Sequence, residues 1–141
     1  MSKKICIRAN LILLIWFFFD MTGLRIGNFI LTEMAWQEDG IFFIIYIACF
    51  LLFLFKDKFG KYVLSIWIFL WGITQFFSHW YYTIFGASQS KLNMYNNIYS
   101  ETYHIVSRSE TTIVPDLYHI ILHILIVISF LCTINCLRRK K

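Results

Sequence analysis

Four long apolar stretches dominate this sequence and limit what it can fold into. They lie at about residues 9–31, 37–56, 63–85 and 113–137 of the 141-residue chain. A helix needs roughly 20 mostly apolar residues to cross the hydrocarbon core of a bilayer, and each stretch is close to that length. The runs are continuous rather than alternating, which disfavours a transmembrane β-barrel. The sequence therefore predicts an all-α, polytopic membrane protein, with residues 1–141 forming a single four-helix transmembrane bundle.

The composition excludes the other common classes of protein. Residues of the AVILMFWYC set make up 59% of the chain, and charged residues make up only 15%. A soluble domain usually carries about 25% charged residues, so this chain lacks the charge needed to cover a water-facing surface. A disordered chain is excluded for the same reason, because disorder requires low hydrophobicity and high charge.

Basic residues are concentrated on one side of the predicted bundle. Three precede the first stretch, three separate the second stretch from the third, and four follow the last stretch. The positive-inside rule therefore places both chain ends in the cytoplasm. The net charge of +5 is explained by anionic lipid, and nucleic-acid binding is not expected. The expected location is the bacterial cytoplasmic membrane, or the endoplasmic reticulum in a eukaryote, and the expected partner is the lipid bilayer. Whether the chain also forms a homo-oligomer or binds a partner membrane protein stays open.

Several polar residues interrupt the apolar stretches, where polar groups are costly and often functional. At 1.5 Å per residue from the outer ends of the predicted helices, Asp20 and Gln75 are expected near the middle of the membrane. A second layer, closer to the outer surface, is expected to hold one arginine and three histidines: Arg25, His79, His119 and His123.

The spacing of these polar residues places them on defined helix faces. In the fourth stretch, Asp116, His119 and His123 stand at positions i, i+3 and i+7, which share one face of a helix. The third stretch has a comparable stripe, formed by Gln75, His79 and Tyr82. Because such stripes turn away from lipid, we expect them to face each other across an outward-facing polar pocket.

The residue types in this pocket suggest three kinds of function. Zinc or another divalent metal is expected to take its ligands from His79, Asp116, His119 and His123, since histidine is the commonest metal ligand. A small polar or lipidic ligand without a metal is the second possibility, contacting Asp20, Arg25, Gln75 and Tyr82. The third is a hydrogen-bond network in which Asp116 caps the fourth helix.

These possibilities correspond to three classes of protein. The first is a small integral membrane protein that binds a metal or a small polar or lipidic ligand. The second is a membrane-embedded, metal-dependent hydrolase or transferase that acts on a lipidic substrate. The third is a non-catalytic subunit, an adaptor or an oligomeric channel. The sequence leaves open whether the protein is an enzyme.

The segments outside the apolar stretches add detail to the outer side. Within residues 86–112, the spacing of Leu92, Tyr95 and Tyr99 predicts a short amphipathic helix that covers the pocket. The first outer loop contributes an acidic rim, which consists of Glu33, Glu38 and Asp39. Gly23 and Gly27 are four residues apart, and this spacing predicts a helix-packing site in the first stretch.

Overall fold

The computed structural model describes residues 2–138, which are mostly helical. Four helices are long and apolar enough to cross a membrane, as the sequence predicts. They are α1 (Lys3–Thr22), α2 (Trp36–Phe55), the continuous helix that begins with α3 (Asp57–Gln75), and α6 (Leu117–Leu137). After α3 the third helix passes through a π-helical turn, η1 (Phe76–Trp80), into α4 (Tyr81–Phe85). The remaining elements are the antiparallel hairpin β1 (Leu24–Ile26) and β2 (Phe29–Thr32), and the short helix α5 (Gln89–Ile98).

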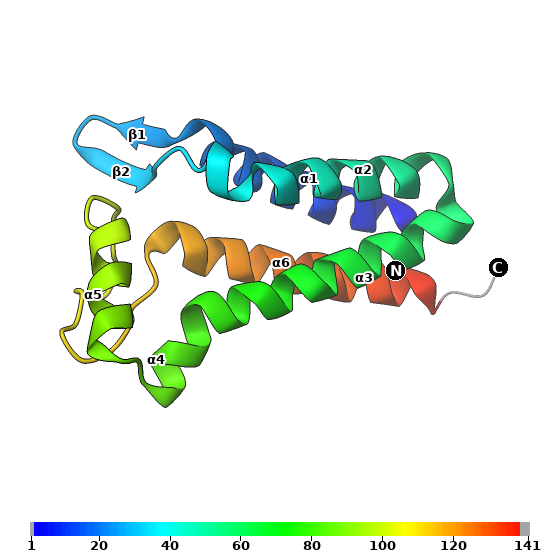
Figure 1. Ribbon diagram of the computed structural model, residues 1–141. Helices are drawn as coiled ribbons and strands as arrows, with labels where there is room; N and C mark the ends of the chain where they lie inside the picture. The colour runs from blue at the N-terminus through cyan, green and yellow to red at the C-terminus, as the bar shows by residue number, and fades with distance from the viewer. Residues whose placement is uncertain (1, 139–141) are drawn as a thin grey trace.

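The four long helices form a bundle in which α1 and α3 each pack against both α2 and α6 (Figure 1). One end of the bundle carries the start of α1, the α2–α3 connection and the end of α6, and the hairpin and α5 lie at the opposite end. The α2–α3 connection is very tight. A Cβ atom built on Gly60 would lie 2.3 Å from the carbonyl oxygen of Leu52, so only glycine fits at this position.

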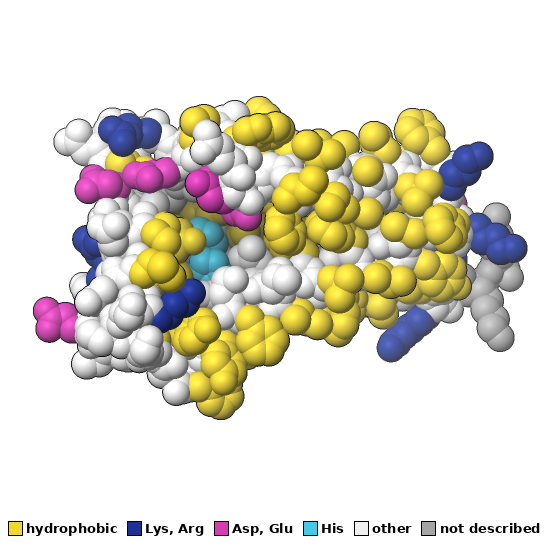
Figure 2. All heavy atoms as spheres, in the orientation of Figure 1, with side chains coloured by type: hydrophobic (Ala, Val, Ile, Leu, Met, Phe, Trp, Pro, Cys, Tyr) yellow, Lys and Arg dark blue, Asp and Glu magenta, His cyan; other side chains and the backbone are white. Residues whose placement is uncertain are grey.

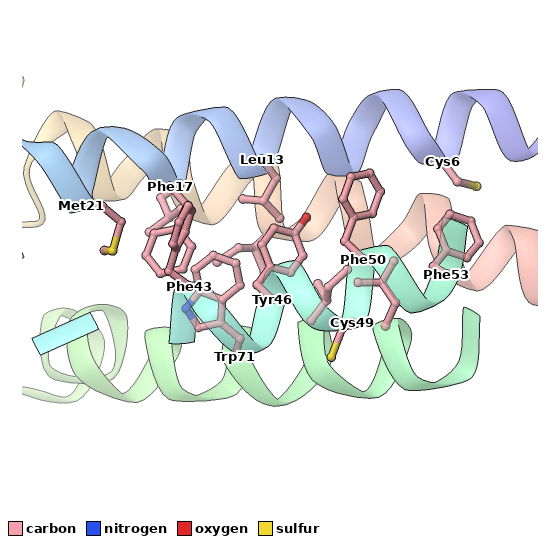
Figure 3. Close-up of a cluster of buried hydrophobic side chains, with 14 of the residues drawn as sticks. Cys6, Leu13, Phe17, Met21, Phe43, Tyr46, Cys49, Phe50, Phe53 and Trp71 are labelled. Atoms are coloured by element: carbon pink, nitrogen blue, oxygen red, sulfur yellow. The ribbon is translucent and has the colours of Figure 1, made fainter. Parts of the chain in front are cut away.

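Aromatic side chains fill the middle of the bundle (Figure 3). The rings of Phe17 on α1 and Trp71 on α3 have centroids 4.5 Å apart, and Tyr46 on α2 lies 5.5 Å from Trp71. All three side chains are almost completely buried. Packing between helices therefore accounts for part of the high aromatic content, since offset and tilted ring pairs are favourable contacts.

A buried polar network ties α1 to α2 and α6 in the half of the bundle near the chain ends. The Asn10 side-chain amide donates to the carbonyl oxygen of Cys6 at 2.9 Å and to Thr133 Oγ1 at 3.2 Å. The Tyr46 hydroxyl lies 3.0 Å from Asn10 Oδ1, to which it donates. Because all of these buried groups have partners, the network favours one alignment of the three helices.

The first helix differs most from its prediction. It occupies Lys3–Thr22 instead of residues 9–31 and is followed by the hairpin. Gly23 has φ +71° and Gly27 has φ +59°, values that glycine adopts far more readily than other residues, so the chain leaves the helix at Gly23. The predicted helix-packing role of these two glycines is therefore wrong. Asp20 lies in the last turn of α1, not halfway along a longer helix.

The other helices lie close to their predicted positions. The second begins at Trp36 and ends at Phe55, against the predicted 37–56, and the third begins at Asp57 rather than at residue 63. The fourth begins at Leu117, four residues later than predicted, because Asp116 adopts an extended conformation and caps the helix. In the outer segment, α5 buries Leu92 and Tyr95.

Candidate functional site

The π-helical turn η1 determines which side chains of the third helix face the interior. In a regular α-helix, residues five apart point about 140° away from each other. In a π-helical turn the backbone hydrogen bonds instead link residues that are five apart. Such turns occur frequently at functional sites. Here it allows Gln75 and Trp80 to contact the same ring, that of His123 on α6. His79, inside the turn, is 3% exposed.

Three histidines from two helices gather at this level. The ring centroids of His79 and His119 are 4.3 Å apart, and those of His79 and His123 are 5.2 Å apart. The rings of His119 and His123, on the same face of α6, are 6.2 Å apart. Figure 2 shows histidine at the bottom of a hollow on one face of the molecule, with Asp and Glu side chains along the edge.

Both ring nitrogens of His123 are occupied by the neighbouring helix. Trp80 Nε1 donates to Nδ1 of His123 at 2.6 Å, which makes this nitrogen an acceptor. The other nitrogen, Nε2, lies 3.0 Å from Gln75 Oε1 and must then carry the proton and donate it. His123 is therefore neutral and holds α6 against the π-helical turn. It has no free nitrogen for a ligand.

His119 has a different arrangement, because its own helix cap fixes one side of its ring. Asp116 Oδ1 accepts from the backbone N–H of His119 at 2.9 Å and lies 2.6 Å from Nδ1 of its ring. Burial raises the pKa of the Asp116 carboxyl, but the hydrogen bonds and the proximity of His119 outweigh this effect, and the pKa is lowered overall. The charged carboxylate is an acceptor, so Nδ1 is the donor. In the neutral ring, the lone pair of Nε2 is then free for another partner.

His79 completes the cluster through a tyrosine of the outer helix α5. The Tyr95 hydroxyl lies 2.6 Å from Nδ1 of His79. Tyr99 packs nearby, with its ring centroid 5.0 Å from that of His119. Burial is the main cause that raises the pKa of Tyr95, and it keeps this hydroxyl protonated at neutral pH. Helix α5 therefore covers the histidines with the two tyrosines on its inner side.

A cavity of about 260 Å³ opens beside His119. It lies between the end of α1, the segment that joins β2 to α2, and the chain that follows α5. Four of its lining residues carry carboxylates, and no lysine or arginine lines it. We call it the acidic cavity. Its lining consists of Asp20, Thr32, Glu33, Met34, Ala35, Glu38, Asp39, Ile98, Tyr99, Thr102 and His119.

Burial and nearby carboxylates raise the pKa of Tyr99, which lines the acidic cavity. The pKa of Tyr99 is raised first by burial and then by the negative charges of Asp116, Asp39 and Asp20. Asp20 is 4% exposed, and its Oδ1 accepts a hydrogen bond from Thr32 Oγ1 at 2.7 Å. Asp20 therefore pairs with Thr32, and not with Gln75 or a histidine as its predicted depth would suggest.

Two of the predicted site residues lie away from this cluster. Arg25 is exposed on β1, because the first helix ends before it, and it forms no ion pair with any residue between 2 and 138. Tyr82 follows the π-helical turn and packs against the buried side of α5, where the Lys91 ammonium lies 5.2 Å from its ring centroid. The remaining histidine, His104, contacts the backbone oxygen of Thr102.

The geometry gives no support to the predicted metal site. Across the described range 2–138, no three side chains of His, Cys, Asp or Glu are grouped so that they could hold a metal ion. The hydrogen bonds agree with this, since both nitrogens of His123 are occupied and Nδ1 of His79 and of His119 contact other partners.

The sequence predicts the elements that carry several residues of the site, but not the contacts between these residues. Tyr95 and Tyr99 belong to the predicted outer helix, and Glu38 and Asp39 to the predicted acidic rim, but their meeting at His119 depends on how the loops fold. Trp80 had no distinguishing signal, because its contact with His123 requires the π-helical turn.

Comparison with known proteins adds no assignment: no family model, no curated protein and no solved structure matches the chain.

Proposed function

We propose that the chain is a multi-pass membrane protein with both ends in the cytoplasm, and that it binds a small polar ligand in the acidic cavity on the outer side. One observation carries the proposal: the cavity is lined by His119, whose Nδ1 is fixed by Asp116 and whose Nε2 is free. A buried ring with one nitrogen fixed and the other open beside a cavity is suited to receive a donor group from a ligand.

The orientation rests on the basic residues. Lys3, Lys56 and Lys58 belong to the end of the bundle that carries the start of α1 and the α2–α3 connection, while the acidic cavity lies at the hairpin end. The positive-inside rule places the basic end in the cytoplasm, and the cavity then opens to the outside. A bacterial cytoplasmic membrane is the proposed location, with the endoplasmic reticulum as its eukaryotic counterpart.

The Asp116–His119 pair favours a second candidate function. A carboxylate that fixes the tautomer of a histidine, with the second nitrogen open to a cavity, is the arrangement of a general base. The chain would then be a membrane hydrolase or transferase in which His119 removes a proton from water or from a substrate hydroxyl. The small size of the cavity makes binding the first choice.

The orientation is tested by labelling in intact cells. The four native cysteines are free and are replaced by alanine, and single cysteines are introduced at Glu38, in the cavity wall, and at Lys58, at the other end. A membrane-impermeant maleimide is expected to label Glu38→Cys and to leave Lys58→Cys unlabelled. The reverse pattern would show that the cavity faces the cytoplasm.

Ligand binding is tested by filling the cavity. Ala35→Phe places a ring in the cavity wall, and Ser90→Phe adds the same ring on the exposed side of α5 as the matched control. Thermal unfolding is followed in detergent with a panel of small amines, carboxylic acids and polyols. A ligand at 100 times its Kd stabilises the folded state by about 2.7 kcal/mol. We expect this gain for the wild type and Ser90→Phe but not for Ala35→Phe. Equal responses in all three proteins would contradict a ligand site in the cavity.

A further inference from the structure

We infer that the ligand of the acidic cavity is a small organic cation with several N–H donors, such as a diamine. This inference rests on the proposed function and names the class of its ligand. Three properties of the cavity lead to it: the hydrogen-bonding capacity of the lining, its charge, and the distribution of its polar groups.

Two buried side chains present acceptors to the cavity. Asp20 is 4% exposed; its Oδ1 accepts a hydrogen bond from Thr32 at 2.7 Å, and its carboxyl lies within hydrogen-bonding reach of the Asp39 carboxyl. His119 is 7% exposed, and its Nδ1 is held by Asp116, so that Nε2 of the neutral ring is an acceptor without a partner in the described part of the chain. A pair of carboxyls and an open ring nitrogen at one cavity suit a ligand with at least two donors, since buried polar groups normally have hydrogen-bond partners.

The charge of the lining selects a cation. Asp20, Glu33, Glu38 and Asp39 all line the cavity, and its lining contains no lysine or arginine. Two of these carboxylates, Asp39 and Asp20, also raise the pKa of Tyr99, after burial and Asp116. A carboxylate in a partly desolvated site is costly unless a positive group pairs with it. A bound cation would supply that pairing.

The distribution of these groups favours an organic cation over a metal ion. A metal ion needs its ligands within one coordination sphere, and residues 2–138 contain no such grouping of His, Cys, Asp and Glu. The cavity volume of about 260 Å³ leaves room for more than a bare ion. A diamine carries donors at both ends and reaches acceptors that lie apart. Tyr99, in the wall, adds a ring face that attracts an ammonium group.

The inference is tested with putrescine as the probe. Its affinity for the purified, detergent-solubilised protein is compared by calorimetry with the affinities of 1,4-bis(trimethylammonium)butane, which has the same two charges but no N–H donors, and of Zn²⁺ and Ca²⁺. We expect putrescine to bind about tenfold more tightly than this bis-quaternary cation, since a hydrogen bond to a charged group contributes enough for such a ratio. Tighter binding of either metal ion, or equal binding of the two organic cations, would overturn the inference.

Three single substitutions locate the site. Asp20→Asn removes the buried charge, and Asp39→Asn removes the charge of a half-buried residue that the fold tolerates more easily. Glu110→Gln is the matched control, because it removes one charge from an exposed outer residue that does not line the cavity. We expect Asp39→Asn, and Asp20→Asn where it folds, to weaken putrescine binding by about tenfold. Glu110→Gln should leave it unchanged. Equal effects of Asp39→Asn and Glu110→Gln would show that only the overall surface charge matters.

A protection experiment separates failure of this inference from failure of the proposed function. Putrescine, citrate and glycerol are each tested for slowing the labelling of Met34→Cys, an exposed lining position without a charge. Protection by putrescine alone supports the inference. Protection by citrate or glycerol but not by putrescine would keep a ligand site in the cavity and overturn its assignment to a cation. If no compound slows labelling and none raises the unfolding temperature, both the inference and the proposed function fail.

Discussion

The carboxylate of Asp116 caps helix α6 and, at 2.6 Å, holds the ring of His119, which belongs to the same helix. One oxygen atom therefore fixes both the start of the helix and the tautomer of the histidine at the acidic cavity. Local chain geometry is sufficient for this, since a cap and the third residue after it always lie close together. The site does not depend on a distant residue for its most important contact.

Asp116→Ala should destabilise the protein by about 2–4 kcal/mol, because it removes a helix cap and a hydrogen bond between charged or strongly polar groups. Asp116→Asn should cost less, since asparagine is also a good cap. Thermal unfolding in detergent measures both values. A loss for Asp116→Asn as large as that for Asp116→Ala would mean that the cap contributes nothing.

The same pair predicts how stability depends on pH. The pKa of Asp116 is lowered in the folded protein, although burial alone would raise it, because hydrogen bonds from His119 favour the charged form. Its stabilising effect is therefore complete above the unfolded pKa, about 4, and is lost as the pH falls through the lower folded pKa. Between pH 5 and pH 2, about the range of this loss, the wild type should lose more stability than Asp116→Asn. Parallel unfolding curves for the two proteins would show that Asp116 does not cause the acid sensitivity.

His123 should prove to be structural. His123→Leu leaves the Trp80 indole N–H and the Gln75 side chain without their partner, and it should cost about 1–3 kcal/mol. Putrescine affinity should change little under conditions where the variant is folded. His104→Ala is the comparison, because His104 contacts only a nearby backbone oxygen and its loss should cost less. If His123→Leu abolishes binding while stability is retained, the ring belongs to the ligand site after all.

Asn10 should stabilise the half of the bundle near the chain ends. Asn10→Leu removes two donated hydrogen bonds and one of the two acceptors of the Tyr46 hydroxyl, whose other acceptor is the backbone oxygen of residue 10. We expect a loss of about 1 kcal/mol, as is usual for hydrogen bonds between helices in membranes. A double-mutant cycle with Tyr46→Phe isolates the contribution of the pair. Additive losses would mean that the two side chains do not interact energetically. Because neither residue lines the acidic cavity, ligand affinity should be the same in all three variants.

The fourth helix shows what the sequence can predict. Its polar stripe from Asp116 to His123 follows regular α-helical spacing, and the helix is regular over that range, so the predicted face is the observed one. The four apolar helices could be predicted for a similar reason, because a hydropathy pattern depends on length and composition alone. Backbone conformation is not part of that pattern. The apolar residues on both sides of Gly23 extend the first apolar stretch to residue 31, although the chain leaves the helix at that glycine.

The third helix shows what the sequence does not reveal. Gln75, His79 and Tyr82 share a face only if the helix is regular, and η1 interrupts it between Gln75 and Tyr81. No residue in the segment Phe76–Trp80 is a known signal for a π-helical turn. The turn moves Trp80 onto His123 and leaves Tyr82 facing α5. Contacts across the bundle, and not local preference, determine this part of the site.

Deleting Ser78 tests the role of the π-helical turn directly. Ser78 is exposed within η1, and its removal takes one residue out of the turn, so that the segment can return to a regular α-helix. Each residue after the deletion then rotates by about 100° relative to Gln75. Trp80 should lose His123, and His79 should lose Tyr95. We expect unchanged far-UV circular dichroism, altered tryptophan fluorescence and weaker putrescine binding. Ser78→Ala keeps the length of the turn and should change stability by less than about 0.5 kcal/mol. If the deletion leaves fluorescence and affinity as they are in Ser78→Ala, the π-helical turn does not position the site.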